Sequence, residues 1–155
     1  MKVLFVCLGN ICRSPMAEGL MRQRAQEKGI ELFVDSAATS SWEAGNPPHE
    51  GTQNILRQAG IDFSKMHARQ ITETDFHTFD FIIGMDQNNL RDLQKIAPAG
   101  TEKKIHLYLS VVPDKKAMAV PDPWYTGDFQ ETYQLLKEGL DSWLAVLQAE
   151  RNSKA

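Results

Sequence analysis

The most informative segment of the chain reads Lys2-Val3-Leu4-Phe5-Val6-Cys7-Leu8-Gly9-Asn10-Ile11-Cys12-Arg13-Ser14-Pro15. Its apolar first half is typical of a buried β-strand, and its closing Ser-Pro pair is typical of a helix start. A loop that joins a strand to a helix in this way offers unpaired N–H groups and a positive dipole end, which attract phosphate. We therefore predict a phosphate-binding loop after Cys7. Its residues are Leu8, Gly9, Asn10, Ile11, Cys12, Arg13 and Ser14.

The residue types in this loop suit attack on a phosphate ester. Gly9 and Asn10 tolerate the positive φ angles of a tight turn. Arg13, six residues after Cys7, can present its planar guanidinium to two phosphate oxygens. Cationic and helix-terminal surroundings favour thiolate, a strong nucleophile, so we expect Cys7 to attack phosphorus while the Ser14 hydroxyl stabilises its sulfur. The alternative, a Cys7 that only packs in the core, leaves Arg13 unexplained.

Composition places this chemistry in an ordinary globular protein. The 155 residues are 42% apolar and 24% charged, which predicts one phosphatase domain over residues 1–155. The net charge is −3 and the basic residues are scattered, so neither nucleic acid nor a membrane is an expected partner. No apolar run is long enough for a membrane helix, and Met1-Lys2 leads directly into the first strand without a signal peptide. We expect a cytoplasmic protein.

Apolar segments alternate with amphipathic ones, which predicts an α/β domain with a parallel sheet. The predicted strands lie near residues 2–7, 32–36, 79–84 and 104–109. The predicted helices lie near residues 15–28, 49–59, 86–97 and 129–150, with a short helical turn from Thr72. The last helix carries an apolar stripe at steps of three and four residues, which should face the core. The stripe consists of Phe129, Tyr133, Leu136, Leu140, Trp143 and Leu147.

The loops that follow the strands should contain the acid that a phosphatase needs. In open α/β sheets, ligands bind beyond the carboxyl ends of the strands, which here are followed by residues 35–48, 85–86 and 110–128. Expulsion of an alkoxide or phenoxide is easier when a carboxylic acid protonates the leaving oxygen. Asp122 is our candidate, because two flanking prolines restrict its backbone. Asp114 and Asp128 are the rivals in the same segment.

Three aromatic residues fall in these loops and not on a core stripe. Trp42, Trp124 and Tyr125 are expected to form the walls of a slot deep enough for phosphotyrosine, whereas the shorter phosphoserine would not reach the thiol. The alternative is that they seal the hydrophobic core. The histidines show no metal-ligand spacing, so we expect neither a metal nor another cofactor. They are His49, His67, His77 and His106.

Together these residues make the chain similar to the low-molecular-weight protein tyrosine phosphatases over nearly its whole length. Beside the phosphate loop, the matching positions are Asp35-Ser36, Trp42, Arg69-Gln70, Met85-Asp86 and Asp122-Pro123. The resemblance implies a three-layer α/β/α fold whose middle layer is a four-stranded parallel sheet of order 2-1-3-4. It also implies Cys7 as nucleophile, Arg13 as phosphate clamp and Asp122 as general acid and then general base. Asn10, Ser14 and Ser36 would support the loop.

The chain departs from the family pattern at two places, and a third position bears on the choice of substrate. The family commonly has a histidine three residues before the Arg69 position, bonded to the loop asparagine, but here Met66 stands there and His67 follows. Trp124 stands where the family often has a tyrosine that is phosphorylated, although Tyr125 could still be modified. Related protein-arginine phosphatases carry threonine at the Ile11 position, so Ile11 favours phosphotyrosine.

Cys12 lies five residues after Cys7, and phosphoryl transfer does not require it. Either it is a packed small side chain, or it traps oxidised Cys7 as a disulfide before irreversible oxidation. Spacing and resemblance together favour the protective role.

Three other functions remain open. A thioredoxin-coupled arsenate reductase has a similar loop but needs more cysteines than the two present here, and a protein-arginine phosphatase shares the fold. A non-catalytic phosphotyrosine-binding module would need the loop but not Asp122. The expected partners are tyrosine-phosphorylated proteins or small aryl phosphates, and the chain is expected to be a monomer or a weak homodimer.

Overall fold

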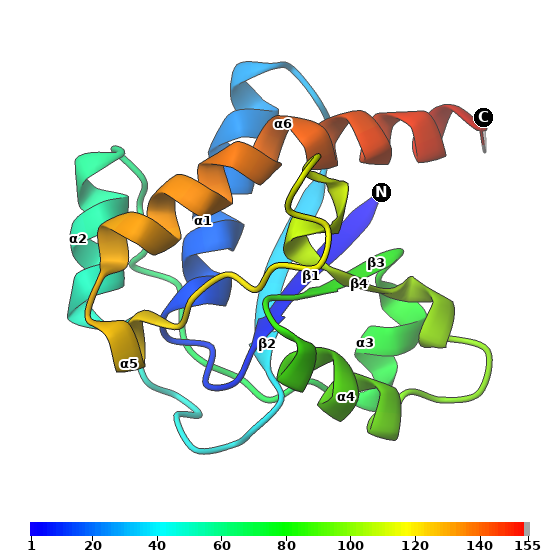
Figure 1. The fold of residues 1–155 in the computed structure, drawn as a ribbon, viewed down its shortest axis with the longest axis horizontal. Coiled ribbons are helices and arrows are strands. Elements are labelled where there is room, and N and C mark those ends of the chain that lie inside the picture. Colours follow the sequence, from blue (N-terminus) through cyan, green and yellow to red (C-terminus); the bar gives the residue numbers. More distant parts are fainter. Residues whose placement is uncertain (154–155) are drawn as a thin grey trace.

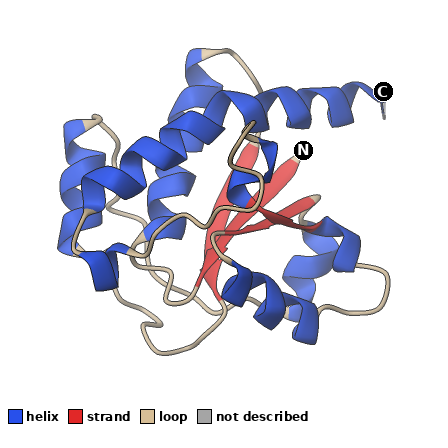
Figure 2. Cartoon of the chain, in the orientation of Figure 1, coloured by secondary structure: helices blue, strands red, loops and turns tan. Residues whose placement is uncertain are grey.

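The computed structural model describes residues 1–153 of the chain, in which a parallel sheet lies between two groups of helices (Figures 1 and 2). The strand order is β2-β1-β3-β4, and every neighbouring pair is parallel. This confirms the predicted fold class and strand order. The strands are β1 (Lys2–Cys7), β2 (Phe33–Ala38), β3 (Phe81–Gly84) and β4 (Ile105–Leu107).

The helices divide between the two faces of the sheet (Figure 1). On one face, α1 (Arg13–Glu27) and α6 (Phe129–Ser153) pack together, with α2 (Glu50–Gln58) beside them. On the other face lie α3 (Glu73–Thr78) and α4 (Gln87–Ile96). Shorter helices complete the chain. They are α5 (Pro123–Thr126) and the 3₁₀ helices η1 (Glu102–Lys104) and η2 (Tyr108–Val111).

The central strand β1 supplies side chains to both hydrophobic cores. Val3 and Phe5 point into the larger core, which α1 and α6 close, whereas Leu4 and Val6 point into the core beneath α3 and α4. A parallel strand that is buried on both faces has a continuous apolar sequence, which is what made β1 recognisable. On α6, the predicted stripe is buried from Leu136 onward, and its first residues, Phe129 and Tyr133, are partly buried. The buried members are Leu136, Leu140, Trp143 and Leu147.

The predicted elements exist, and their ends differ by a few residues. Helix α1 begins at Arg13 rather than at residue 15, and β2 extends to Ala38. The turn predicted from Thr72 is helix α3, which Thr72 begins with a capping box shared with Asp75. Such a box satisfies N–H groups that a helix start would otherwise leave unpaired. Asp86 begins α4 in the same way.

The carboxyl ends of the parallel strands lie along one edge of the sheet, and the phosphate loop begins there after β1. The segments that follow β2 and β4 reach the same edge, which places residues far apart in sequence around one cavity. Among the helices in residues 1–153, none combines the length and apolar character needed to cross a membrane.

Candidate active site

The loop after β1 turns tightly before α1 begins. Asn10 has a φ of +58°, in the left-handed region that asparagine tolerates better than most residues. Of the two residues expected to suit the turn, Gly9 and Asn10, it is Asn10 that takes the positive φ. A Cβ atom on Gly9 would lie 3.5 Å from Cγ of Glu43, an ordinary contact. Asn10 is therefore the residue that turns the chain.

The sulfur of Cys7 is held by a chain of hydrogen bonds. Its Sγ lies 3.1 Å from Oγ of Ser14. The side-chain amide of Asn10 donates to Oγ of Ser14 at 2.7 Å and to Oγ of Ser36 at 2.9 Å. Because Ser14 already accepts from Asn10, its own proton is free to point at the sulfur, the nearest alternative being the Ala37 carbonyl at 3.5 Å. The structure thus brings together all three residues predicted to support the loop.

The chain of hydrogen bonds continues to Glu18, which the sequence analysis missed. Oγ of Ser36 donates to Oε1 of Glu18 at 2.6 Å, and Nη2 of Arg22 donates to Oε2 at 2.5 Å. The buried carboxylate of Glu18 accepts only, so it fixes Ser36 as its donor and thereby the direction of the bonds from Asn10. The one signal in the sequence was the Glu18–Arg22 spacing of four on a helix.

The side chain of Arg13 is buried, with only 2% of it exposed. Its Nη1 donates to Oδ2 of Asp86 at 2.8 Å and to the Val120 carbonyl at 2.9 Å, and its Nη2 lies 3.4 Å from Oδ2 of Asp122. Burial opposes the charge, but the negative charges of Cys7 and Asp122 and the bond to Asp86 outweigh it and raise the pKa of Arg13. The guanidinium stays charged.

One donor of Arg13 is left over. Within residues 1–153, no hydrogen-bond acceptor reaches its buried Nε atom. Buried donors are nearly always paired in folded proteins, and an exception calls for an explanation. An anion in the loop would supply the missing acceptor, because a guanidinium presents its N–H groups as a fork to phosphate oxygens.

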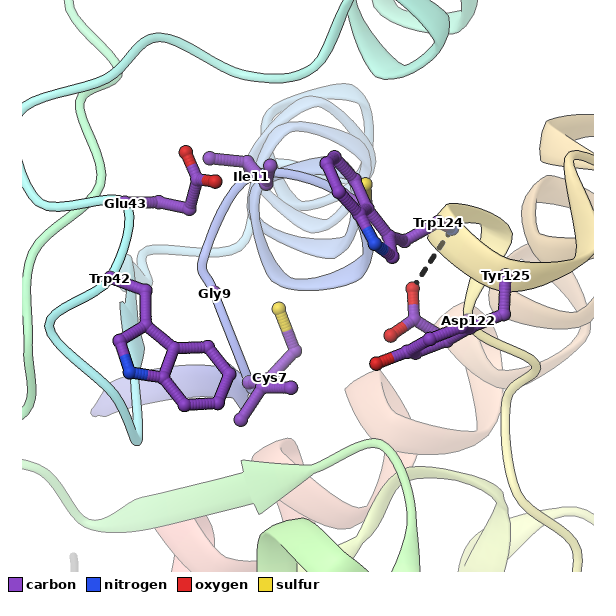
Figure 3. A pocket seen from close by; sticks show the side chains of 10 residues that line it. Cys7, Gly9, Ile11, Trp42, Glu43, Asp122, Trp124 and Tyr125 are labelled. Atoms are coloured by element: carbon purple, nitrogen blue, oxygen red, sulfur yellow. Dashed lines mark hydrogen bonds between the residues drawn. The ribbon is translucent and has the colours of Figure 1, made fainter.

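Asp122 lies at the same cavity and begins α5, where its Oδ1 accepts the backbone N–H of Trp124 at 3.1 Å (Figure 3). Its segment is tied to the fold on both sides. The Val120 N–H donates to the Met85 carbonyl at 2.9 Å, and the Thr132 hydroxyl donates to the Pro121 carbonyl at 3.0 Å. The rivals Asp114 and Asp128 do not line the cavity, and Asp128 accepts from the Glu131 N–H at the start of α6.

The cavity has a volume of about 130 Å³, and Figure 3 shows the Cys7 sulfur between Trp42 and the pair Asp122 and Tyr125. Trp42 and Tyr125 are each 76% exposed and Trp124 is 56% exposed, so these rings stand at the rim and do not seal the core. Glu43, which was not predicted from the sequence, also lines the cavity. The lining comprises Cys7, Leu8, Gly9, Ile11, Cys12, Trp42, Glu43, Asp122, Trp124 and Tyr125.

Cys12 lines the same cavity, and both cysteines are free thiols. Burial raises the pKa of Cys12 to about 12, with a further contribution from the negative charge of Cys7. Cys12 is therefore a neutral thiol at physiological pH.

The histidines take no part in the bonds around Asn10. The exposed His67 places Nδ1 3.2 Å from the Lys65 carbonyl, and Oδ1 of Asn10 accepts the Arg69 N–H at 3.1 Å. His67 therefore does not replace the histidine that the family commonly has. His106 packs on Phe81 and Trp143. Across residues 1–153, no three His, Cys, Asp or Glu side chains are grouped closely enough to hold a metal ion.

Comparison with known proteins gives a consistent result. The sequence model of a family described as "Low molecular weight phosphotyrosine protein phosphatase" matches residues 2–153. The low molecular weight protein-tyrosine-phosphatase YfkJ of Bacillus subtilis is 50% identical over 151 residues, which cover 96% of this chain and 97% of YfkJ. The low molecular weight protein-tyrosine-phosphatase PtpA of Staphylococcus aureus is 41% identical over 154 residues, 98% of this chain and 97% of PtpA.

Solved structures agree with this result. The crystal structure of YfkJ superposes with a TM-score of 0.92 and covers 97% of this chain and 96% of that chain. A structure described as DARP, drosophila arginine phosphatase, is 34% identical and superposes with a TM-score of 0.87, covering 95% of this chain and 98% of its own.

Proposed function

Because this chain belongs to the low molecular weight phosphotyrosine protein phosphatase family, we propose that it hydrolyses phosphotyrosine in proteins, and small aryl phosphate monoesters, through a phosphocysteine intermediate. The proposal rests on one observation, namely that the Cys7 sulfur, the Arg13 guanidinium and the Asp122 carboxyl group lie close together. Cys7 and Asp122 line one cavity, with the Cys7 sulfur and Asp122 facing each other across it (Figure 3). The buried Arg13, whose Nε has no acceptor within residues 1–153, places Nη2 3.4 Å from Asp122.

In the first step, the phosphate of the substrate sits on the loop residues 8–14 and takes hydrogen bonds from their N–H groups and from Arg13. The Cys7 thiolate attacks phosphorus and forms an S–P bond. The P–O bond to the phenol breaks, and the carboxylic acid of Asp122 gives its proton to the departing oxygen.

In the second step, the Asp122 carboxylate takes a proton from water, and the water oxygen attacks the phosphocysteine. The S–P bond breaks, inorganic phosphate leaves, and Cys7 returns as a thiolate. The Ser14 hydroxyl, 3.1 Å from the sulfur, stabilises the thiolate before attack and after departure. Both steps keep the developing charge within a site of fixed donors, which is the main source of catalysis in phosphoryl transfer.

Substrate choice follows from the walls of the cavity. Trp42, Trp124 and Tyr125 rise around the sulfur and offer apolar faces to an aromatic ring. A phosphotyrosine side chain is long enough to reach Cys7 between them, whereas phosphoserine is shorter. We propose these three residues as the walls that select aryl phosphates.

A phosphoarginine phosphatase is the second candidate, favoured by the likeness to the protein described as drosophila arginine phosphatase. Ile11, which lines the cavity, argues against it, because the related arginine phosphatases are expected to carry threonine there. Its apolar side chain offers no hydroxyl to orient water. Phosphotyrosine is therefore the preferred substrate.

A substrate panel tests the proposed function. Wild type should release inorganic phosphate from phosphotyrosine peptides and aryl phosphates, much faster than from phosphoserine or phosphoarginine peptides, and should not reduce arsenate. Cys7→Ser should bind the phosphotyrosine peptide without releasing phosphate. Faster release from phosphoarginine would support the second candidate, and binding by wild type without turnover would support a phosphotyrosine-binding module.

We also propose that Cys12 protects Cys7 by trapping its sulfenic acid as a disulfide, with loss of water. Peroxide followed by a thiol reductant should restore most of the activity of wild type and much less of that of Cys12→Ser. Equal recovery of the two proteins would contradict the protective role.

The proposal also covers the domain organisation, the oligomeric state and the cellular location of the protein. Residues 1–155 form one phosphatase domain, because both hydrophobic cores share the strand β1. The protein works as a monomer or weak homodimer, which sedimentation at several concentrations would test. It acts in the cytoplasm, because a catalytic thiol needs a reducing compartment.

A further inference from the structure

His49 lies just before α2 and contacts the phosphate loop. Its backbone N–H donates to the carbonyl of Ile11 at 2.8 Å. Its ring nitrogen Nδ1 accepts the N–H of Gly51 at 3.0 Å and so caps the start of α2. An accepting Nδ1 carries no proton, so the proton of the neutral ring is on Nε2. His49 therefore ties the loop to α2 in a fixed ring orientation.

The ring of His49 also lies between two aromatic rings from other elements. It stacks on Phe129, the first residue of α6, with centroids 5.0 Å apart and planes at 24°. It meets Trp124 of α5 edge-on, with centroids 5.8 Å apart and planes at 86°. Stacked and edge-on pairs of this kind are favourable beyond the area that they bury. The histidine thus joins the wall of the cavity to α6.

The contact with Trp124 extends to the general acid. The backbone N–H of Trp124 donates to Oδ1 of Asp122, so a shift of Trp124 would move the carboxyl group that faces Cys7. α5 is only four residues long, and a helix of that length has little stability of its own. Beside the hydrogen bonds at Val120 and Pro121, its position therefore depends on side-chain contacts, of which the one with His49 also reaches the phosphate loop.

We propose that His49 is a positioning residue that holds the segment carrying Asp122 against the phosphate loop, a role that rests on the proposed function. The simpler explanation is that His49 only caps α2. A cap needs an acceptor atom and no ring, whereas positioning of Trp124 needs a ring and no acceptor. The two roles therefore call for different side chains.

The packing behind Phe129 leaves the stack little freedom. A Cβ atom on Gly51 would come within 2.5 Å of Cε1 and Cζ of Phe129, closer than real side chains approach. Gly51 therefore lets α2 press against the ring that supports His49. A methyl group at this position should displace Phe129, and with it His49 and Trp124. The residue at position 49 stays a histidine in this variant.

Two variants of His49 separate the roles. His49→Asn keeps an acceptor for the Gly51 N–H and removes the ring, whereas His49→Phe keeps the ring and removes the acceptor. We expect His49→Asn to lower kcat/KM about tenfold for phenyl phosphates with poor leaving groups, because displacement of a catalytic group by a fraction of an ångström is costly. The loss should be smaller for good leaving groups, and His49→Phe should stay within about threefold of wild type. The exposed His77→Asn is the matched control.

Fluorescence gives a readout without turnover. In a Trp42→Phe background, the remaining tryptophans are Trp124, which is exposed, and Trp143, which is buried. Acrylamide quenching then reports mainly on Trp124. It should increase when His49→Asn is added and stay unchanged with His49→Phe. Gly51→Ala should resemble His49→Asn in both quenching and leaving-group dependence.

The outcomes are separable. Equal kinetics and quenching for His49→Asn and His49→Phe would overturn the positioning role. So would a greater loss in His49→Phe, because the cap would then be the important contact. If wild type released no phosphate from any aryl ester, the proposed function would fail instead, whatever the quenching showed. Iodoacetate alkylation of Cys7 at one pH should be the same in all variants, since the loop sulfur keeps its own hydrogen bonds.

Discussion

At the scale of single residues, the proposed role of Asp122 as general acid can be tested directly by substitution. Replacement by Asn keeps the size and the acceptor for the Trp124 N–H but removes the transferable proton. We expect kcat to fall by about 10²–10³ for phenyl phosphates with poor leaving groups. The effect should be smaller for nitrophenyl phosphate, whose leaving group needs little protonation. Steady-state kinetics with a series of aryl phosphates would measure this.

The pH profile of the same variant is a second check. In wild type the rate should rise and then fall with pH, because the thiolate must be ionised while Asp122 keeps its proton. In Asp122→Asn the fall on the alkaline side should disappear for good leaving groups. An unchanged profile and unchanged leaving-group dependence would mean that another residue is the acid.

The role of Glu18 is a further prediction at this scale, and only the structure could provide it. Glu18→Gln removes the charge that orients Ser36 and pairs with Arg22. We expect kcat to fall about threefold to tenfold and the free energy of unfolding to fall by about 1–3 kcal/mol, as for loss of a buried hydrogen bond to a charge. Alkylation of Cys7 by iodoacetate at a fixed pH should slow as well.

Glu27→Gln is the matched control for this prediction, because Glu27 is exposed on the same helix. It should behave like wild type in kinetics, alkylation and unfolding. Equal behaviour of the two variants would show that the carboxylate of Glu18 does not orient the bonds that lead to the sulfur.

These residues mark how far the sequence could predict the site. Cys7 and Arg13 are six residues apart on one loop, so local spacing was enough to select them. Glu18 of α1 acts through Ser36 of β2, and only the packing of α1 on β2 brings the two together. Gly9 and Asn10 both tolerate a positive φ by residue type, and only the structure shows that Asn10 is the one that takes it.

At the scale of elements, α3 holds the chain that passes behind the phosphate loop. Asp75 of α3 accepts from Arg69 and from Thr72, and the Arg69 N–H bonds to Asn10. Burial opposes ionisation of Asp75, but the hydrogen bonds from Arg69 and Thr72 outweigh it and lower its pKa. A carboxyl whose pKa is lower in the folded state stabilises the fold above its unfolded pKa of about 3.9 and loses this effect as pH falls through the folded value.

Asp75→Asn should therefore destabilise the protein at neutral pH by about 1 kcal/mol, since Arg69 is 35% exposed and solvent screens the pair. The difference from wild type should shrink below about pH 4. Thermal unfolding of both proteins at several pH values would measure it. A difference that stayed constant from pH 7 to pH 3 would contradict the assignment to this carboxylate.

Elements with long apolar patterns were predictable, and the short one that carries the acid was not. The continuous apolar run of β1 and the apolar stripe of α6 were clear signals, whereas α5 has only four residues and no such pattern. Its signals were local, namely Asp122 as cap, Pro123 at the first position and Gly127 with a φ of +72° at the end. Such caps identify a helix only after its existence is suspected.

At the scale of the whole molecule, the parallel sheet explains why distant segments form one site. The chain returns to the same edge after each strand, so the loop after β1 meets Trp42 after β2 and Asp122 after β4. The alternation of strands and helices predicted this arrangement. It could not predict the Gly51–Phe129 approach or the stacking on His49, because those depend on how α2, α5 and α6 pack around one another.

The central claim, covalent capture of the phosphoryl group by Cys7, is tested most directly by trapping the intermediate. Asp122→Asn, mixed with nitrophenyl phosphate and quenched in acid within the first turnovers, should carry one phosphoryl group on the peptide that contains Cys7, as detected by mass spectrometry. The label should be absent from the same variant carrying Cys7→Ser. A phosphoryl group on another residue, or turnover with no labelled enzyme at any time, would contradict the claim.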